Sequence, residues 1–94
     1  MPDTLIEDKT ETTNILGTPH NVILFNDSVH SFDEVIMQIM RAIKCSAGKA
    51  GEIAMKAHSS GEAVVFCGSL ERCEHIDSIL AGPPASLRTS IQPA

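Results

Sequence analysis

The chain of 94 residues contains no tryptophan and no tyrosine, and only three phenylalanines. It therefore lacks the series of aromatic side chains on which bases stack in proteins that bind single-stranded nucleic acid. Positive charge is also scarce, because seven lysines and arginines are set against twelve aspartates and glutamates, for a net charge of −5. This balance disfavours a nucleic-acid surface and suits a basic partner or a ligand with a cationic group.

Long apolar runs are missing as well. No stretch approaches the roughly eighteen consecutive apolar residues of a transmembrane helix, and the acidic, polar start differs from a secretory signal peptide. The three cysteines, Cys45, Cys67 and Cys73, form no Cys-x-x-Cys pair. We therefore expect reduced thiols in a cytoplasmic protein, without a membrane partner.

At this length the chain forms at most one domain with one modest core. Residues 1–19 carry four acidic side chains against one lysine and few large apolar residues. Such a segment cannot bury enough surface to order itself. We expect a flexible tail over residues 1–19, serving as a solubilising leader or as an arm that a partner grips, and a folded domain over residues 20–94.

The stretch Val22-Ile23-Leu24-Phe25-Asn26-Asp27-Ser28 predicts a strand that runs into a polar turn. Its first four residues form a short apolar run rich in β-forming side chains, so we place a buried strand over residues 20–25. Asn26, Asp27 and Ser28 have short polar side chains that bond nearby backbone groups and favour turns. Such a turn can present side chains to a ligand.

A helix is predicted directly after this turn, over residues 32–44. Ser31 and Glu34 have the spacing of a capping box, and apolar residues then repeat at helical spacing. The remaining predicted elements are a helix from Ser46 to about Ser59, a strand over residues 62–67, a helix over residues 70–81 capped by Ser69, and an edge strand over residues 87–91. The last helix should stop at Gly82, a residue suited to the left-handed position after a helix.

The order β-α-α-β-α-β predicts the α+β class: a three-stranded antiparallel sheet with three helices packed on one face.

Catalytic and metal-binding arrangements have weaker support. Cys67 and Cys73 have no local signature of a nucleophile and are expected to be buried and inert. Together with His75 their spacing matches no standard zinc pattern. His30, His58 and Asp27 could form an acid–base set or a metal site, but no strong nucleophile or phosphate loop stands beside them.

The segment Val22 to Asp27, the helical pattern after it, and residues 52–64 (Glu-Ile-Ala-Met-Lys-Ala-His-Ser-Ser-Gly-Glu-Ala-Val) together resemble the ClpS family over about residues 20–91. Members of this family are adaptors of the N-end rule. They bind proteins that carry a destabilising N-terminal residue and deliver them to a AAA+ unfoldase, usually ClpA, which feeds the ClpP protease. The predicted fold agrees with the family's fold.

The resemblance implies roles for particular side chains. Asn26, Asp27 and His58 match the groups that receive the free α-amino group of the bound chain. Ser28 and His30 lie at the rim of the site. The residues at positions that line the hydrophobic hole beneath it are Phe32, Val35, Ala54, Ala57 and Leu87. Glu71 matches an acidic residue of the surface that contacts the unfoldase, and the tail over residues 1–19 becomes a delivery arm.

The sequence departs from the family at several of these positions. Ser28 stands where the family often has a second aspartate, and His30-Ser31-Phe32 replaces a common Thr-Pro-Met run. Ala54 and Ala57 replace larger apolar residues. We therefore expect a hole that is narrower beside Phe32 and wider beside the alanines, with preference for N-terminal Phe, Leu, Tyr or Trp and some tolerance of branched side chains.

The resemblance also predicts a pH effect, since an imidazole accepts a hydrogen bond from an ammonium only while it is neutral. Binding should therefore weaken below about pH 6 if His58 makes this contact.

We expect a monomeric recognition module that is not an enzyme, with no cofactor and no metal. Two alternatives stay open: an interaction domain like the C-terminal domain of the ribosomal stalk, and a small hydrolase or metal enzyme built on His30, His58 and Cys67.

Overall fold

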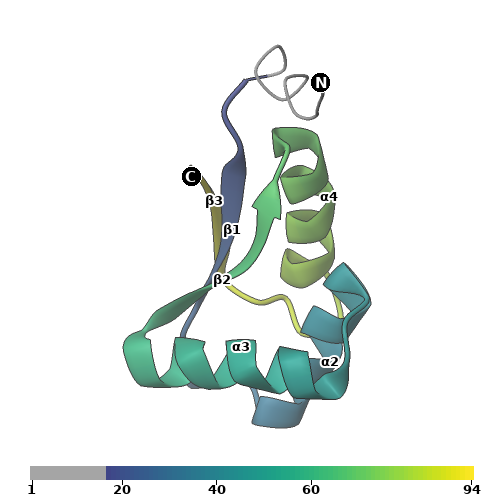
Figure 1. Ribbon diagram of the computed structural model, residues 1–94. Helices are drawn as coiled ribbons and strands as arrows, with labels where there is room; N and C mark the ends of the chain where they lie inside the picture. Colours follow the sequence, from purple (N-terminus) through teal and green to yellow (C-terminus); the bar gives the residue numbers. More distant parts are fainter. Residues whose placement is uncertain (1–16) are drawn as a thin grey trace.

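The computed structural model describes residues 17–94 (Figure 1). The predicted tail therefore lies outside the described residues as far as residue 16. The elements follow the order β-α-α-β-α-β, and the predicted α+β class is confirmed. Within residues 17–94, no helix combines the length and apolar character that crossing a membrane requires.

Three antiparallel strands form the sheet in the order β2-β1-β3. The central strand β1 (His20–Phe25) coincides with its predicted range. On one side β2 (Glu62–Gly68) pairs with it, so that Phe25 lies opposite Glu62 and His20 lies opposite Gly68. On the other side lies β3 (Thr89–Pro93). The chain thus enters the turn after Phe25 at the same end of the sheet where β2 begins.

The last strand begins two residues later than predicted. Leu87 belongs to the connection from the preceding helix instead, because its N–H donates to the carbonyl of Leu80 (2.9 Å) and its side chain is buried. Ser86 before it has a positive φ of 53°, a left-handed conformation that does not belong to a strand. The predicted edge position of the strand is confirmed, since within residues 17–94 β3 pairs with β1 alone.

Three helices complete the fold: α2 (Phe32–Ile43), α3 (Ala47–Ser60) and α4 (Leu70–Ala81). Each is capped by the predicted serine, whose hydroxyl accepts from the backbone N–H three residues later. Gly82 differs from its prediction, because it is the C-cap of α4 with an extended backbone (φ −87°, ψ 178°) rather than a left-handed one. A β-carbon there would lie 2.8 Å from the carbonyl oxygen of Ser78, so close approach accounts for the glycine.

The helices enclose one core against the sheet. In Figure 1, α4 runs along the sheet, whereas α2 and α3 lie across the end where β1 finishes and β2 begins. Val22 and Leu24 of β1 belong to this core together with Ile39 of α2, Ile53 of α3 and Leu80 of α4. The arrangement leaves the polar turn after β1 between the sheet and two helices.

The cysteines differ in their surroundings. Cys73 of α4 is fully buried, as predicted, and burial raises the pKa of its thiol. The prediction for Cys67 was wrong, because this residue is exposed. Cys67 lies opposite Asn21 in the sheet, and side chains alternate along a strand, so both point away from the face that carries Val22.

Candidate functional site

The polar turn after β1 is held at its start by two backbone hydrogen bonds. The N–H of Phe25 donates to the carbonyl of Arg88 (3.0 Å), and the N–H of Asn26 donates to the carbonyl of Gly61 (2.9 Å). These bonds fix the end of β1 to the segment before β3 and to the corner between α3 and β2. The Asn26 side chain is thereby presented at the surface, where it is exposed.

The Asp27 carboxylate accepts several hydrogen bonds from its own turn. One oxygen accepts from the N–H of Val29 (2.6 Å) and from the N–H of His30 (3.3 Å). The other oxygen is 2.5 Å from Nδ1 of His30. The bond from Val29 is the main reason why the pKa of Asp27 lies below its ordinary value; burial opposes this lowering, and the bonds from His30 add to it.

The far end of the turn is fixed by the capping box that the sequence predicts. The Ser31 hydroxyl accepts from the N–H of Glu34 (3.1 Å), and the Glu34 carboxylate accepts from the N–H of Ser31 (2.7 Å). This reciprocal pair determines where α2 begins, and therefore where its first residue, Phe32, projects. Val35 lies one turn further along the same helix.

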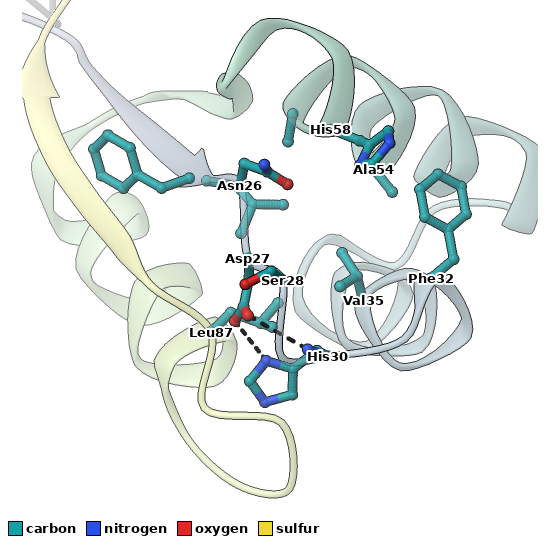
Figure 2. A pocket seen from close by; sticks show the side chains of 12 residues that line it. Asn26, Asp27, Ser28, His30, Phe32, Val35, Ala54, His58 and Leu87 are labelled. Atoms are coloured by element: carbon teal, nitrogen blue, oxygen red, sulfur yellow. Dashed lines mark hydrogen bonds and ion pairs between the residues drawn. The ribbon is translucent and has the colours of Figure 1, made fainter.

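The opposite wall of the site comes from α3. Ala54 and Ala57 are buried, with exposed fractions of 3% and 4%, while His58 in the last turn is exposed. Small side chains at these positions leave open space between α3 and the turn. Figure 2 shows the rings of His58 and Phe32 close to each other, one from each helix.

A cavity of about 410 Å³ lies between the turn and the two helices (Figure 2). Polar side chains from the turn and from the end of α3 stand around it together with apolar side chains from the sheet and both helices. The lining residues are Leu24, Phe25, Asn26, Asp27, Ser28, His30, Phe32, Val35, Ala54, Ala57, His58 and Leu87. Ten of these were singled out from the sequence, and the structure brings all ten together.

Two lining residues were missed by the sequence reading. Leu24 and Phe25 were assigned to a buried strand, yet they are the last two residues of β1, beside the opening. Their position directly before the Asn26-Asp27 pair is a signal that could have indicated this role. Phe25 is partly covered by Arg88, whose guanidinium carbon lies 5.2 Å from the ring centroid.

Glu71 does not line this cavity. It is an exposed residue in the first turn of α4. Because β2 runs from Glu62 opposite Phe25 to Gly68 opposite His20, α4 begins at the end of the sheet away from the turn. In Figure 1 this end of α4 is remote from α2 and α3.

The structure separates the residues of the alternative catalytic sites. Cys67 lies near the far end of β2, opposite Asn21, whereas His30 and His58 line the cavity at the other end of the sheet. In the part of the chain that the structure describes, no group of three His, Cys, Asp or Glu residues is placed to hold a metal ion. The site instead combines hydrogen-bond acceptors with an apolar hollow.

Sequence comparison assigns the chain to a family. The model of the family described as ATP-dependent Clp protease adaptor protein ClpS matches residues 17–82. The chain belongs to the ClpS family. The predicted membership is confirmed, and the matched range contains every lining residue except Leu87.

A solved ClpS structure and two larger proteins are also similar to this chain. The structure of Agrobacterium tumefaciens ClpS2 bound to L-phenylalaninamide superimposes with a TM-score of 0.76 and 22% identity, covering 82% of this chain and 98% of that one. This likeness confirms the ClpS fold. The E3 ubiquitin-protein ligase UBR1 of Drosophila melanogaster is 32% identical over 71 residues, and human UBR2 is 31% identical over 58 residues. These stretches are 76% and 62% of this chain but span only 4% and 3% of the two ligases.

Proposed function

We propose that this ClpS-family chain is an adaptor that binds the free α-amino group and the hydrophobic first side chain of substrate proteins. It then delivers them to a AAA+ Clp unfoldase of the ClpA type for degradation by ClpP, without chemistry of its own. The observation that carries the proposal is one cavity lined by both polar acceptors and apolar side chains. L-phenylalaninamide, the ligand of the similar ClpS2 structure, combines a free α-amino group with an aromatic side chain.

The polar groups at the cavity suit an ammonium group. An α-ammonium has three N–H donors, while the amide oxygen of Asn26, the carboxylate of Asp27 and a neutral imidazole of His58 are acceptors. Charge-assisted hydrogen bonds of this kind contribute roughly 1.5–3 kcal/mol each. Acetylation removes the charge and two donors and adds bulk, so an acetylated N-terminus should be rejected.

The apolar part of the cavity suits the first side chain of the bound protein. Leu24, Val35, Ala54 and Ala57 surround a hollow of about 410 Å³, which is a typical size for a small-ligand site. Burial of a Leu or Phe side chain contributes roughly 1.5–3 kcal/mol. After the cost of association we expect micromolar affinity for N-terminal Phe, Leu, Tyr or Trp.

The proposed unfoldase contact lies elsewhere on the molecule. Glu71 is exposed at the start of α4, at the end of the sheet away from the cavity. An adaptor that presents cargo at one end and contacts its unfoldase at the other can hold both at once. This separation supports a role for Glu71 in delivery rather than in cargo binding.

A peptide titration tests cargo recognition directly. Fluorescence anisotropy would compare a peptide with a free N-terminal Phe and the same peptide acetylated at its N-terminus. We expect micromolar binding of the free peptide only, and loss of that binding in the variant Asn26→Ala. A purely structural interaction domain, the alternative class, would bind neither peptide.

A degradation assay tests delivery. A folded reporter protein with an N-terminal Phe would be incubated with a ClpA–ClpP pair and either the wild-type chain or the variant Glu71→Lys. We expect the variant to bind the Phe peptide normally and to slow degradation of the reporter. Unchanged degradation would remove Glu71 from the unfoldase surface while leaving cargo binding intact.

A further inference from the structure

The carboxylate of Asp27 is held from within its own turn, and His30 makes two of the three contacts. Nδ1 of His30 lies 2.5 Å from one carboxylate oxygen, and the His30 N–H donates to the other (3.3 Å). Both side chains are largely enclosed, with exposed fractions of 19% for His30 and 15% for Asp27. The third contact is the N–H of Val29.

The His30 ring points away from the residues of α3 that line the cavity (Figure 2). An ionised carboxylate only accepts hydrogen bonds, so Nδ1 of His30 carries the proton that lies between them. In Figure 2 the His30 ring lies on the side of Asp27 that is away from His58 and Ala54. His30 also lines the cavity, but the Asp27 carboxylate lies between its ring and α3 (Figure 2), so we expect its main influence on a ligand beside α3 to pass through that carboxylate.

The rest of the turn offers the carboxylate little other support. Ser28 is exposed and Val29 is 85% exposed, and the hydrogen bonds that Asp27 accepts within the described residues come from the backbone of Val29 and from His30. The backbone bond from Val29 holds only the oxygen that His30 Nδ1 does not contact. Without the imidazole, the second oxygen loses its partner and the carboxylate gains freedom to rotate into solvent.

We propose that His30 is a positioning residue that fixes the Asp27 carboxylate at the rim, in the orientation in which it receives the α-ammonium of the cargo. This inference rests on the function proposed above. The electrostatic gain between two charges depends on where each is held before they meet, so an ordered carboxylate binds the ammonium with less loss of freedom. His30 itself contacts Asp27, not the cargo.

The test is a double-mutant cycle on affinity for the free Phe peptide. We expect His30→Ala to weaken binding about three- to tenfold, the range of one lost hydrogen bond. His30→Asn should restore binding to within about twofold, because an asparagine Nδ2 can donate from nearly the same place. In a chain that already carries Asp27→Asn, His30→Ala should change affinity by less than about twofold, since its effect passes through the carboxylate. Val29→Ala serves as the matched control in the same turn, because the Val29 side chain is exposed and does not line the cavity, and the variant keeps the backbone N–H that donates to Asp27.

The outcomes separate this proposal from its alternatives. An equal loss from His30→Ala with and without Asp27→Asn would mean that His30 touches the cargo or only shapes the loop, and would overturn the proposal. Failure of His30→Asn to restore binding, with the variant folded by thermal unfolding, would do the same. If the wild-type chain binds no free Phe peptide, the proposed function fails instead.

A measurement on the unliganded chain tests the positioning role of His30 whether or not the chain binds the free Phe peptide. The carboxyl carbon of Asp27 would be followed by nuclear magnetic resonance during an acid titration of the unliganded chain. The titration midpoint should rise in His30→Ala and return toward the wild-type value in His30→Asn. A midpoint that is the same in all three proteins would overturn the proposal even if peptide binding is intact.

Discussion

The rings of Phe32 and His58 meet edge to face, with centroids 6.3 Å apart and planes at 88°. Phe32 is the first residue of α2 and His58 lies in the last turn of α3, so the contact joins two elements that are separate in the sequence. Both residues line the cavity, which lies between their helices (Figure 2). One aromatic contact thus links an apolar wall to a proposed amine-binding group.

We first predict that Phe32→Ala weakens binding of a free Phe peptide by about two- to tenfold. The change removes an edge-to-face pair, which is worth roughly 0.5–1.5 kcal/mol, and widens the cavity beside His58. Anisotropy titration measures the effect, with Met37→Ala as the control, because Met37 is an exposed residue of the same helix that does not line the cavity. Equal affinity of both variants would show that the aromatic contact does not support the site.

The second prediction concerns the shape of the first side chain. Ala57 is buried beside the cavity, and its small size should leave room for a branched chain. Ala57→Val adds two methyl groups there, so we expect binding of an Ile peptide to fall much more than binding of a Leu peptide. Ala47→Val makes the same change at an exposed position of α3 and controls for helix propensity. If Ile is rejected equally by the wild type and Ala57→Val, the inferred tolerance is wrong.

Local signals in the sequence predicted most of the secondary structure. The side chains of Ser31, Ser46 and Ser69 each cap a helix through a contact only three residues away, so the evidence for each helix start lies within one turn of sequence. The short apolar run before Asn26 likewise predicted β1. These features placed Asn26 at the end of a strand without knowledge of the tertiary structure.

Features that depend on distant contacts were not predictable in this way. The start of β3 depends on the bond between Leu87 and Leu80, and the exposure of Cys67 depends on its partner across the sheet. The pairing of His30 with Asp27 depends on side-chain rotamers in the turn, which residue spacing does not specify. The residues that line the cavity were predicted from the family resemblance, which implied no role for Phe25, so Phe25 was missed.

The third prediction is a loss of affinity for the free Phe peptide between pH 7.5 and pH 5.5. Asp27 should stay ionised throughout, because its pKa is lowered by the bonds within its turn. An imidazole, in contrast, accepts a hydrogen bond from an ammonium only while it is neutral, so acidification works against the contact proposed for His58. The loss should be largely absent from His58→Gln, which binds more weakly but evenly across pH. A flat profile for the wild type would remove His58 from the amine contact.

The fourth prediction concerns stability and Asp27 itself. A carboxyl whose pKa is lower in the folded state stabilises that state above its unfolded pKa of about 3.9, and the contribution is lost as pH falls through the folded value. Asp27→Asn should therefore lower the free energy of unfolding by about 1 kcal/mol at pH 7 and by much less near pH 3. Urea unfolding at both pH values measures the difference. Glu52→Gln, which removes an exposed charge on α3, should not lower the free energy of unfolding by a comparable amount at pH 7.

The final prediction concerns Gln38, which is 1% exposed and connects α2 to the end of α4. Its side-chain NH₂ donates to the carbonyls of Ile79 (2.8 Å) and Gly82 (2.9 Å), and its oxygen accepts from Arg41 (3.0 Å). Gln38→Leu keeps most of the volume but removes this donor from two carbonyls that retain backbone bonds from Gly82 and Ser86, so we expect a cost of roughly 0.5–1.5 kcal/mol for each lost hydrogen bond. In a domain of this size each kcal/mol lowers the Tm by about 4–8 °C.

A second substitution at the same position isolates the donor. Gln38→Glu keeps the shape of the side chain but turns an ionised oxygen toward the two carbonyls, so at pH 7 it should lower the Tm more than Gln38→Leu does. Acidification that protonates the new carboxyl should recover part of this loss, because the group can then donate one hydrogen bond. Gln92→Leu, at an exposed position of β3, should leave the Tm nearly unchanged. Equal Tm values for the Leu and Glu variants at pH 7 would mean that Gln38 acts by filling space rather than by donating hydrogen bonds.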